Sequence, residues 1–84
     1  RLLVHRAALE KDAGKNFTLT AAQAKLITGR LAVKATEEAV QIHGGYGYIK
    51  GARVERLMRD AKILEIYEGT SEAQRMVISG TVLR

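Results

Sequence analysis

TAAQAKLITGRLAVKATEEAVQIHGG, residues 20–45, is the longest stretch of the chain with a single helical period. Its apolar residues recur at spacings of three and four, as on an amphipathic helix. They are Ala24, Ile27, Leu31, Ala35 and Ala39, with Val40 and Ile42 widening the stripe. Thr20 and Gln23 have the spacing of a capping box, which opens a helix. The stretch therefore predicts a helix from Thr20 to about His43, with an alanine-rich face that a second helix can approach closely.

Glycines punctuate the rest of the chain, which holds eight glycines and no proline. Residues 1–13 form an apolar-periodic run that Gly14 ends, and a third helix is expected from about Arg53 to Tyr67. Ser71 and Gln74 have the spacing of a second capping box, which opens a fourth helix through Val82. No segment has a strand pattern. The predicted fold class is all-α, an antiparallel helical-bundle fragment of about four helices.

The length of 84 residues allows one small domain at most. A chain of this size buries only about 60–65% of its unfolded surface, so its core is marginal. The chain starts with Arg1 and enters directly on the first apolar run, so we expect a piece of a larger protein that would self-associate in isolation. Cysteine is absent, which excludes disulfides and thiolate metal sites. No apolar run reaches the roughly 18 residues of a membrane span, and no signal peptide is expected.

The charge is positive, with 14 Lys and Arg against nine Asp and Glu, a net +5. A positive field suits an anionic partner such as a nucleotide cofactor, a coenzyme or a nucleic acid. The basic residues are spread singly instead of gathered in a run, which is typical of solvated helix faces. Those of residues 59–62 are expected to form local helix ion pairs. Nucleic-acid binding is therefore not expected.

The turn Tyr67-Glu68-Gly69-Thr70-Ser71-Glu72 places a carboxylate beside a glycine where one predicted helix ends and the next begins. Apolar Ile66 and Tyr67 precede Glu68, and the backbone donors of the next helix follow it. A base that removes a proton from carbon needs such surroundings, because a dry apolar pocket makes a carboxylate more basic. An ordinary solvated loop carboxylate is the alternative.

Glycines also gather where the long helix is expected to end, at Gly44, Gly45 and Gly47. They follow a helix instead of a strand, so they do not match the dinucleotide-binding fingerprint. They serve either as a helix stop or as a backbone that a ligand can approach closely. His43 has only His5 as a histidine companion, so a metal site is not predicted.

Four blocks stand in a fixed order along the chain: QIHGGYGY at 41–48, VER at 54–56, RDAKI at 59–63, and IYEGTSE at 66–72 with QR at 74–75. This series resembles the C-terminal signature of the acyl-CoA dehydrogenase family. The resemblance covers roughly residues 16–84 and is closest to the short-chain or butyryl-CoA branch. One departure is visible, because the proline that commonly precedes the valine of the second block is absent.

The resemblance implies the architecture of a larger enzyme. Residues 1–84 would form part of its C-terminal helical domain, behind a helical and a β-domain, in a tetramer that binds FAD and serves fatty-acid β-oxidation. An electron-transferring flavoprotein would accept the electrons. The location would be cytoplasmic in a bacterium and the mitochondrial matrix in a eukaryote. The isolated chain would be inactive.

The resemblance also implies the chemistry of the turn. Glu68 would remove the pro-R α-proton of a short- or medium-chain acyl-CoA while the β-hydrogen leaves as hydride to flavin N5, which gives a trans-2-enoyl-CoA. The Glu68 N–H would donate to the thioester oxygen together with a flavin ribityl hydroxyl. Gly69 and Tyr67 would contact the substrate.

The flavin would be met by residues from two places. Thr70, Ser71 and Glu72 would meet the flavin beside the base. Gln41, Ile42, His43, Gly44 and Gly45 would contact the ADP half of an FAD bound mainly by another subunit. Two other classes of function stay open: a non-catalytic helical interaction or oligomerisation module, and a basic helical nucleic-acid binder whose affinity would fall steeply with salt.

Overall fold

The computed structural model describes residues 1–84 and is all-α, which confirms the predicted fold class. In chain order the elements are α1 (Leu2–Asp12), α2 (Thr18–His43), α3 (Gly45–Tyr48), α4 (Val54–Lys62), the 3₁₀ turn η1 (Ile63–Glu65) and α5 (Ser71–Val82). The helical elements differ from the expected ones in two places. The glycine-rich segment forms the short α3, and the third helix stops at Lys62 and continues as η1.

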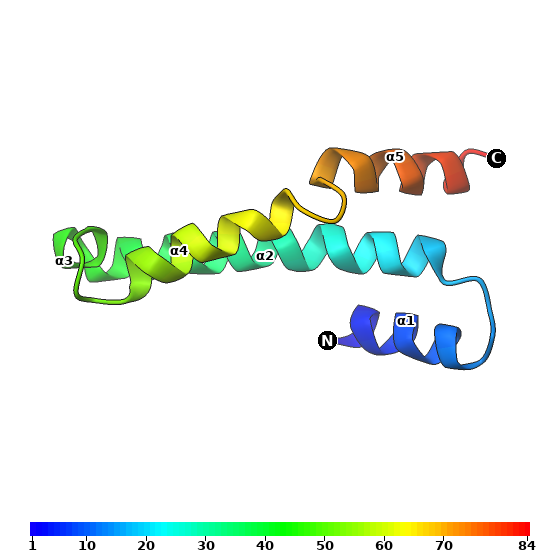
Figure 1. Ribbon diagram of the computed structural model, residues 1–84, viewed down its shortest axis with the longest axis horizontal. Coiled ribbons are helices and arrows are strands. Elements are labelled where there is room, and N and C mark those ends of the chain that lie inside the picture. Colours follow the sequence, from blue (N-terminus) through cyan, green and yellow to red (C-terminus); the bar gives the residue numbers. More distant parts are fainter.

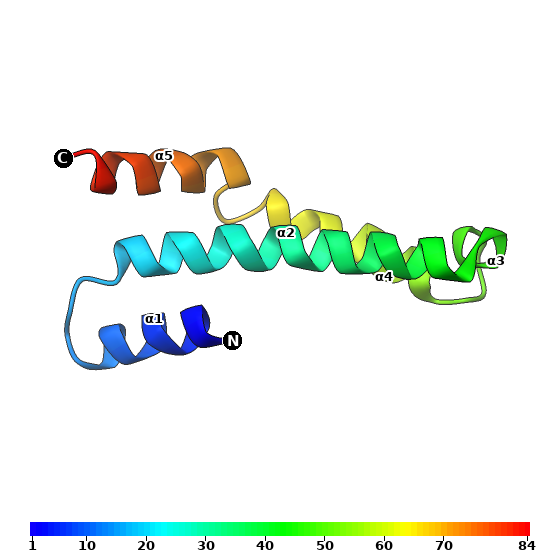
Figure 2. The same ribbon diagram turned by 180° about the vertical axis from the view of Figure 1, so that it is seen from behind.

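The long helix α2 is the axis on which all other elements pack (Figure 1). Helix α1 runs antiparallel to its N-terminal half, and α3 folds back at its C-terminal end. The chain then returns along α2 through α4, η1 and α5, so that the connection between η1 and α5 lies beside the N-terminal half of α2. The view from behind shows the same order (Figure 2).

Helix α2 begins two residues earlier than the sequence predicted, because its N-terminus is not capped by Thr20. The N-cap residue is Phe17, whose side chain makes no capping bond. Just before the helix, the Asn16 side-chain oxygen accepts a hydrogen bond from the Thr18 N–H at 3.0 Å. Thr20 lies inside the first turn and is buried. The predicted Thr20–Gln23 capping box is therefore wrong.

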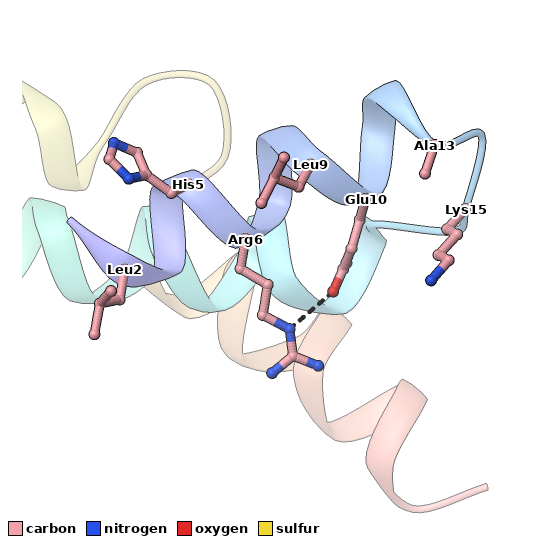
Figure 3. Close-up of a pocket in the computed structure, with 7 residues that line it drawn as sticks. All are labelled: Leu2, His5, Arg6, Leu9, Glu10, Ala13 and Lys15. Atoms are coloured by element: carbon pink, nitrogen blue, oxygen red, sulfur yellow. Dashed lines mark hydrogen bonds and ion pairs between the residues drawn. The ribbon is translucent and has the colours of Figure 1, made fainter.

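Thr20 instead joins α1 to α2. Its hydroxyl donates to a Glu10 carboxylate oxygen at 3.2 Å, and the Arg6 guanidinium donates to the same oxygen at 2.9 Å. Figure 3 shows Arg6 and Glu10 meeting along α1, beside the largest hollow of the chain. The hydrogen bond from Arg6, which has the larger effect, and the hydrogen bond from Thr20 both lower the pKa of Glu10 below its ordinary value. No residue predicted for function lines this hollow.

Small residues make the contacts of α2 with its neighbours. Ala22, Ala24 and Gly29 are buried, whereas Ile27 and Leu31 of the predicted stripe are 50% and 61% exposed. The predicted stripe is therefore covered by this chain only in part. The short side chains allow close helix packing, and the larger apolar ones face away from it.

The structure leaves most of its apolar side chains uncovered. Only seven of 84 residues are buried, and no large side chain is fully buried. The radius of gyration is 15.8 Å, whereas a compact domain of this length has about 12 Å. The chain thus offers wide apolar surfaces for packing against other polypeptide. No helix combines the length and the apolar character that crossing a bilayer requires.

The charges of α4 form local pairs, as predicted. Arg59 contacts Glu55 at 2.9 Å, and Lys62 contacts Glu65 at 3.2 Å. Pairs of this kind between exposed basic groups and carboxylates contribute only about 0.3–0.5 kcal/mol each. They stabilise the segment that leads into the Glu68 turn.

Candidate functional site

The Glu68 turn has an unusual backbone. After η1 the chain reaches Glu68 with φ +54°, in the left-handed region, and Gly69 follows with φ +98°. A side chain in the left-handed region costs about 1–2 kcal/mol, whereas glycine adopts it freely. Such strain persists only where the surroundings impose it, and it concentrates at functional sites. The turn therefore carries a glutamate where glycine would be more stable.

Helix α2 braces this turn from one side. The Lys25 ammonium group donates to the Leu64 carbonyl at 2.8 Å and to the Gly69 carbonyl at 3.2 Å. One turn further along α2, Gly29 lies against the same Leu64 carbonyl, and a Cβ there would be 2.9 Å from the oxygen. Hydrogen bonds to a charged group contribute about 1.5–3 kcal/mol, enough to offset the strain at Glu68 even after partial screening by solvent.

Helix α5 braces the turn from the other side. The Thr70 hydroxyl accepts from the Ala73 N–H at 3.1 Å and so caps α5. The Gln74 side chain donates to the Gly69 carbonyl at 3.3 Å. The predicted capping box of Ser71 and Gln74 is therefore shifted by one residue, because the cap is Thr70 and Gln74 reaches Gly69.

Five of the residues predicted around Glu68 lie together, in the turn and the first residues of α5. They are Tyr67, Gly69, Thr70, Ser71 and Glu72. The first N–H groups of a helix have no partner within the helix, and its N-terminus favours an anion. Ser71 is buried in the turn, and Glu72 is exposed. The structure thus places these residues within one short segment.

A hollow of about 240 Å³ opens beside Glu68. Its lining comes from the middle of α2 and from the turn: Lys25, Thr28, Gly29, Leu64, Tyr67 and Glu68. Tyr67 lines it as expected, but Ile66 does not. Glu68 itself is exposed. The expected dry pocket is therefore not formed by this chain alone.

The backbone of the turn offers a free donor. The N–H of Glu68 donates to no backbone or side-chain acceptor of the chain, whereas the preceding Tyr67 N–H donates to the Ile63 carbonyl at 3.0 Å. An unpaired N–H beside a carboxylate can bind an oxygen that gains negative charge while the carboxylate takes a proton. Glu68 thus presents an exposed carboxylate and an unpaired hydrogen-bond donor on the same residue.

The second predicted cluster lies at the C-terminal end of α2. Gln41, Ile42 and His43 form its last turn, Gly44 ends it with φ +65°, and Gly45 opens α3. At a rise of 1.5 Å per residue, Gln41 is about 18 Å from Gly29 along the helix axis. The two clusters therefore do not meet within this chain, as expected if each contacts a different cofactor molecule.

The glycines at the C-terminal end of α2 differ in their surroundings. A Cβ on Gly44 or Gly45 would meet nothing within 4 Å, so the backbone there is open to an approaching group. Gly47 is needed for packing, because a Cβ there would be 2.7 Å from the Val40 carbonyl oxygen. His43 Nδ1 lies 2.9 Å from the Ala39 carbonyl oxygen, which occupies that ring nitrogen within the helix.

These residues fit an FAD molecule in their chemistry. A pyrophosphate group needs backbone that it can approach closely, and the open flank at Gly44 and Gly45 supplies it. The N-terminus of α5 suits polar or anionic groups of a flavin. The sequence did not single out Lys25 or Gly29, although a glycine inside a helix often signals a close backbone contact.

Comparison with known proteins agrees with this geometry. Residues 1–83 match the family model described as acyl-CoA dehydrogenase, C-terminal domain. A short-chain specific acyl-CoA dehydrogenase of Clostridium acetobutylicum is 57% identical over the whole chain. The chain spans 22% of the length of that relative.

Two solved structures have the same fold over the whole chain. One is the butyryl-CoA dehydrogenase from Megasphaera elsdenii, with 55% identity and a TM-score of 0.95. The other concerns the electron transferring flavoprotein of Acidaminococcus fermentans and flavin-based electron bifurcation, with 48% identity and a TM-score of 0.96. This chain covers 22% of each.

Proposed function

Because the chain belongs to the acyl-CoA dehydrogenase family, whose C-terminal domain it matches, we propose that it is the catalytic end of an FAD-dependent acyl-CoA dehydrogenase. The substrate would be a short- or medium-chain acyl-CoA thioester and the product a trans-2-enoyl-CoA. The observation that carries the proposal is the strained, doubly braced backbone of Glu68 with its unpaired N–H.

Glu68 would act through two of its groups. Its carboxylate takes the α-proton of the thioester, and its N–H donates to the carbonyl oxygen on which the negative charge develops. The acidity of the α-carbon depends on that oxygen being stabilised, so both groups must hold their places at the same moment. Tyr67 and Gly69, on either side of Glu68, would line the acyl group.

The cofactor would be held by the two clusters already described. Thr70, Ser71 and Glu72 would contact the flavin beside Glu68, and residues 41–45 would contact the ADP half of an FAD bound mainly by another subunit. Bound FAD would supply the acceptor for the β-hydride. The apolar surfaces left uncovered on α2 and α4 support packing against further domains and subunits, which would exclude water from the Glu68 hollow.

The electron acceptor and the location follow from the same proposal. An electron-transferring flavoprotein would reoxidise the enzyme, and the structural neighbour from Acidaminococcus fermentans supports this choice. The enzyme would act in the cytoplasm of a bacterium or in the mitochondrial matrix of a eukaryote, as part of a homo-oligomer.

The test uses the full-length protein that carries these residues. Butyryl-CoA should bleach the bound flavin, and Glu68→Gln should abolish the bleaching while flavin stays bound. Glu65→Gln is the matched control, because Glu65 lies three residues earlier and pairs with Lys62 at 3.2 Å. Bleaching that survives Glu68→Gln would move the base elsewhere. A protein that binds neither flavin nor acyl-CoA would favour the non-catalytic interaction module.

A further inference from the structure

We propose that Lys25 is a positioning residue of this reaction, which holds the Glu68 turn in its active conformation from the middle of α2. The inference rests on the proposed role of Glu68 as the base. Lys25 contributes no proton to the substrate. It acts through the backbone of the turn.

The two carbonyls that Lys25 binds lie on opposite sides of Glu68. The Leu64 carbonyl, at 2.8 Å, belongs to η1 before the turn, and the Gly69 carbonyl, at 3.2 Å, follows Glu68 directly. One ammonium group therefore closes a bridge across the segment that contains the base. A compact cation with three donors on a flexible stem is well suited to bind two carbonyls that diverge.

Each carbonyl has a reason to need this cation. The Leu64 carbonyl belongs to the end of the α4–η1 helical segment, where carbonyls lack helical partners and the helix dipole favours a positive charge. The Gly69 carbonyl is oriented by a positive-φ glycine and accepts a second hydrogen bond from Gln74. Without Lys25, the side-chain hydrogen bonds that hold the turn would come only from the α5 side.

Lys25 also lies over the ring of Tyr67, the residue before Glu68. Its Nζ lies 5.9 Å from the centre of the Tyr67 ring, and both residues line the hollow beside Glu68. A cation over the face of an aromatic ring and the ring attract each other electrostatically. Lys25 thus restrains the residue before Glu68 as well as the carbonyl after it, so that both the carboxylate and the free N–H of Glu68 depend on one side chain.

The expected effect is a loss of rate with little change in binding. In the full-length protein, Lys25→Met removes the donors while keeping an unbranched chain of similar length. A misplacement of about 1 Å costs about 100-fold in rate. We expect flavin reduction at saturating butyryl-CoA to fall about 10- to 100-fold per bound flavin, with KM changed less than threefold. The isotope effect with α-deuterated substrate should rise, because proton abstraction becomes more rate-limiting.

Two further variants make the test specific. Lys34→Met is the matched control, because Lys34 is an exposed lysine of the same helix with no hydrogen bond or ion pair, and its rate should equal that of the parent. Lys25→Arg keeps a charged donor and should recover part of the rate. A Lys25→Met enzyme with the parental rate and isotope effect would overturn the inference. So would loss of flavin in both Lys25 variants, which would make Lys25 a purely structural residue.

Glu68→Gln, measured alongside, separates the two proposals. If Glu68→Gln still bleaches flavin, the base is elsewhere and the proposed function of Glu68 fails together with this inference. If Glu68→Gln is inactive and Lys25→Met is as fast as the parent, only the role of Lys25 fails.

Discussion

The contact between Gly29 and the Leu64 carbonyl predicts how closely α2 must approach the turn. In Gly29→Ala the new Cβ would lie 2.9 Å from the Leu64 oxygen and 3.4 Å from its carbonyl carbon. Both atoms are backbone, so neither can move away as a flexible side chain would. The η1 segment must shift away from α2, and the Lys25 bond to the same carbonyl lengthens with it.

The stability change expected for Gly29→Ala follows from two opposing effects. Overpacking a well-packed contact costs about 1–3 kcal/mol. Replacing glycine by alanine inside a helix contributes about 1 kcal/mol of stability. Gly80→Ala in α5 is the matched control, because a Cβ there meets nothing within 4 Å. The helical gain is common to both variants, so Gly29→Ala should be less stable than Gly80→Ala by about 1–3 kcal/mol.

The assay is urea unfolding of the full-length protein followed by helicity, with flavin reduction by butyryl-CoA measured on the same samples. Gly29→Ala should unfold at lower urea than Gly80→Ala with an unchanged slope, and should reduce flavin more slowly because Glu68 is displaced. Equal midpoints and equal rates in the two variants would refute the close contact and the brace built on it.

Three further predictions concern the cap of α5, the Glu68 backbone and the Glu10 contact of α1. Thr70→Ala should lower stability by about 1 kcal/mol through loss of the α5 cap. Ser71→Ala should cost less in the same urea series, since Ser71 makes no capping bond. Glu68→Gly should raise the unfolding midpoint by the equivalent of about 1 kcal/mol, because glycine relieves the left-handed backbone, while flavin bleaching is lost. Glu10→Gln should be less stable than the parent at neutral pH. That difference should shrink as the pH falls through the lowered pKa of Glu10, where the folded carboxylate takes up its proton and its bond with Arg6 weakens.

Helical content could be predicted from the sequence, but the packing face could not. The spacing of apolar residues identifies α2 as a helix, and the structure confirms it from Thr18 to His43. The same spacing placed Ile27 and Leu31 among the packed residues, yet both are exposed. Periodicity identifies an apolar face and does not say which polypeptide covers it. Because so few residues of this chain are buried, an apolar face predicted from periodicity is often not covered by the chain itself.

Helix starts were misplaced by one or two residues for a related reason. Several Ser, Thr and Asn residues lie near the starts of α2 and α5, and any of them can cap a helix. In the structure Thr70 caps α5, whereas α2 begins after Phe17 without a side-chain cap, and Asn16 binds only the Thr18 N–H. Thr20 is instead taken into a tertiary contact with Glu10. Local spacing cannot reveal this competition, because the partner of Thr20 is ten residues away on another helix.

The position of Glu68 in a turn between two helical segments could be predicted, whereas its brace could not. Lys25 looks in the sequence like any solvated lysine of an amphipathic helix. Its partners lie 39 and 44 residues further along the chain. Gly29 was the available signal, because a glycine in the middle of a long helix costs stability unless a close contact requires it.

The central helix thus determines where the Glu68 turn lies. A glutamate with φ +54° cannot hold that conformation by its own preference, so its place is set by Lys25 and Gly29, which share one face of α2. Residues 41–45 extend from the same helix, about 18 Å further along. Because α1, α4 and α5 all pack against α2, the helix would fix the distance between the two proposed sites, at Glu68 and at residues 41–45. Changes that alter the length of α2 between Gly29 and Gln41 should therefore disturb assembly while leaving the Glu68 brace intact.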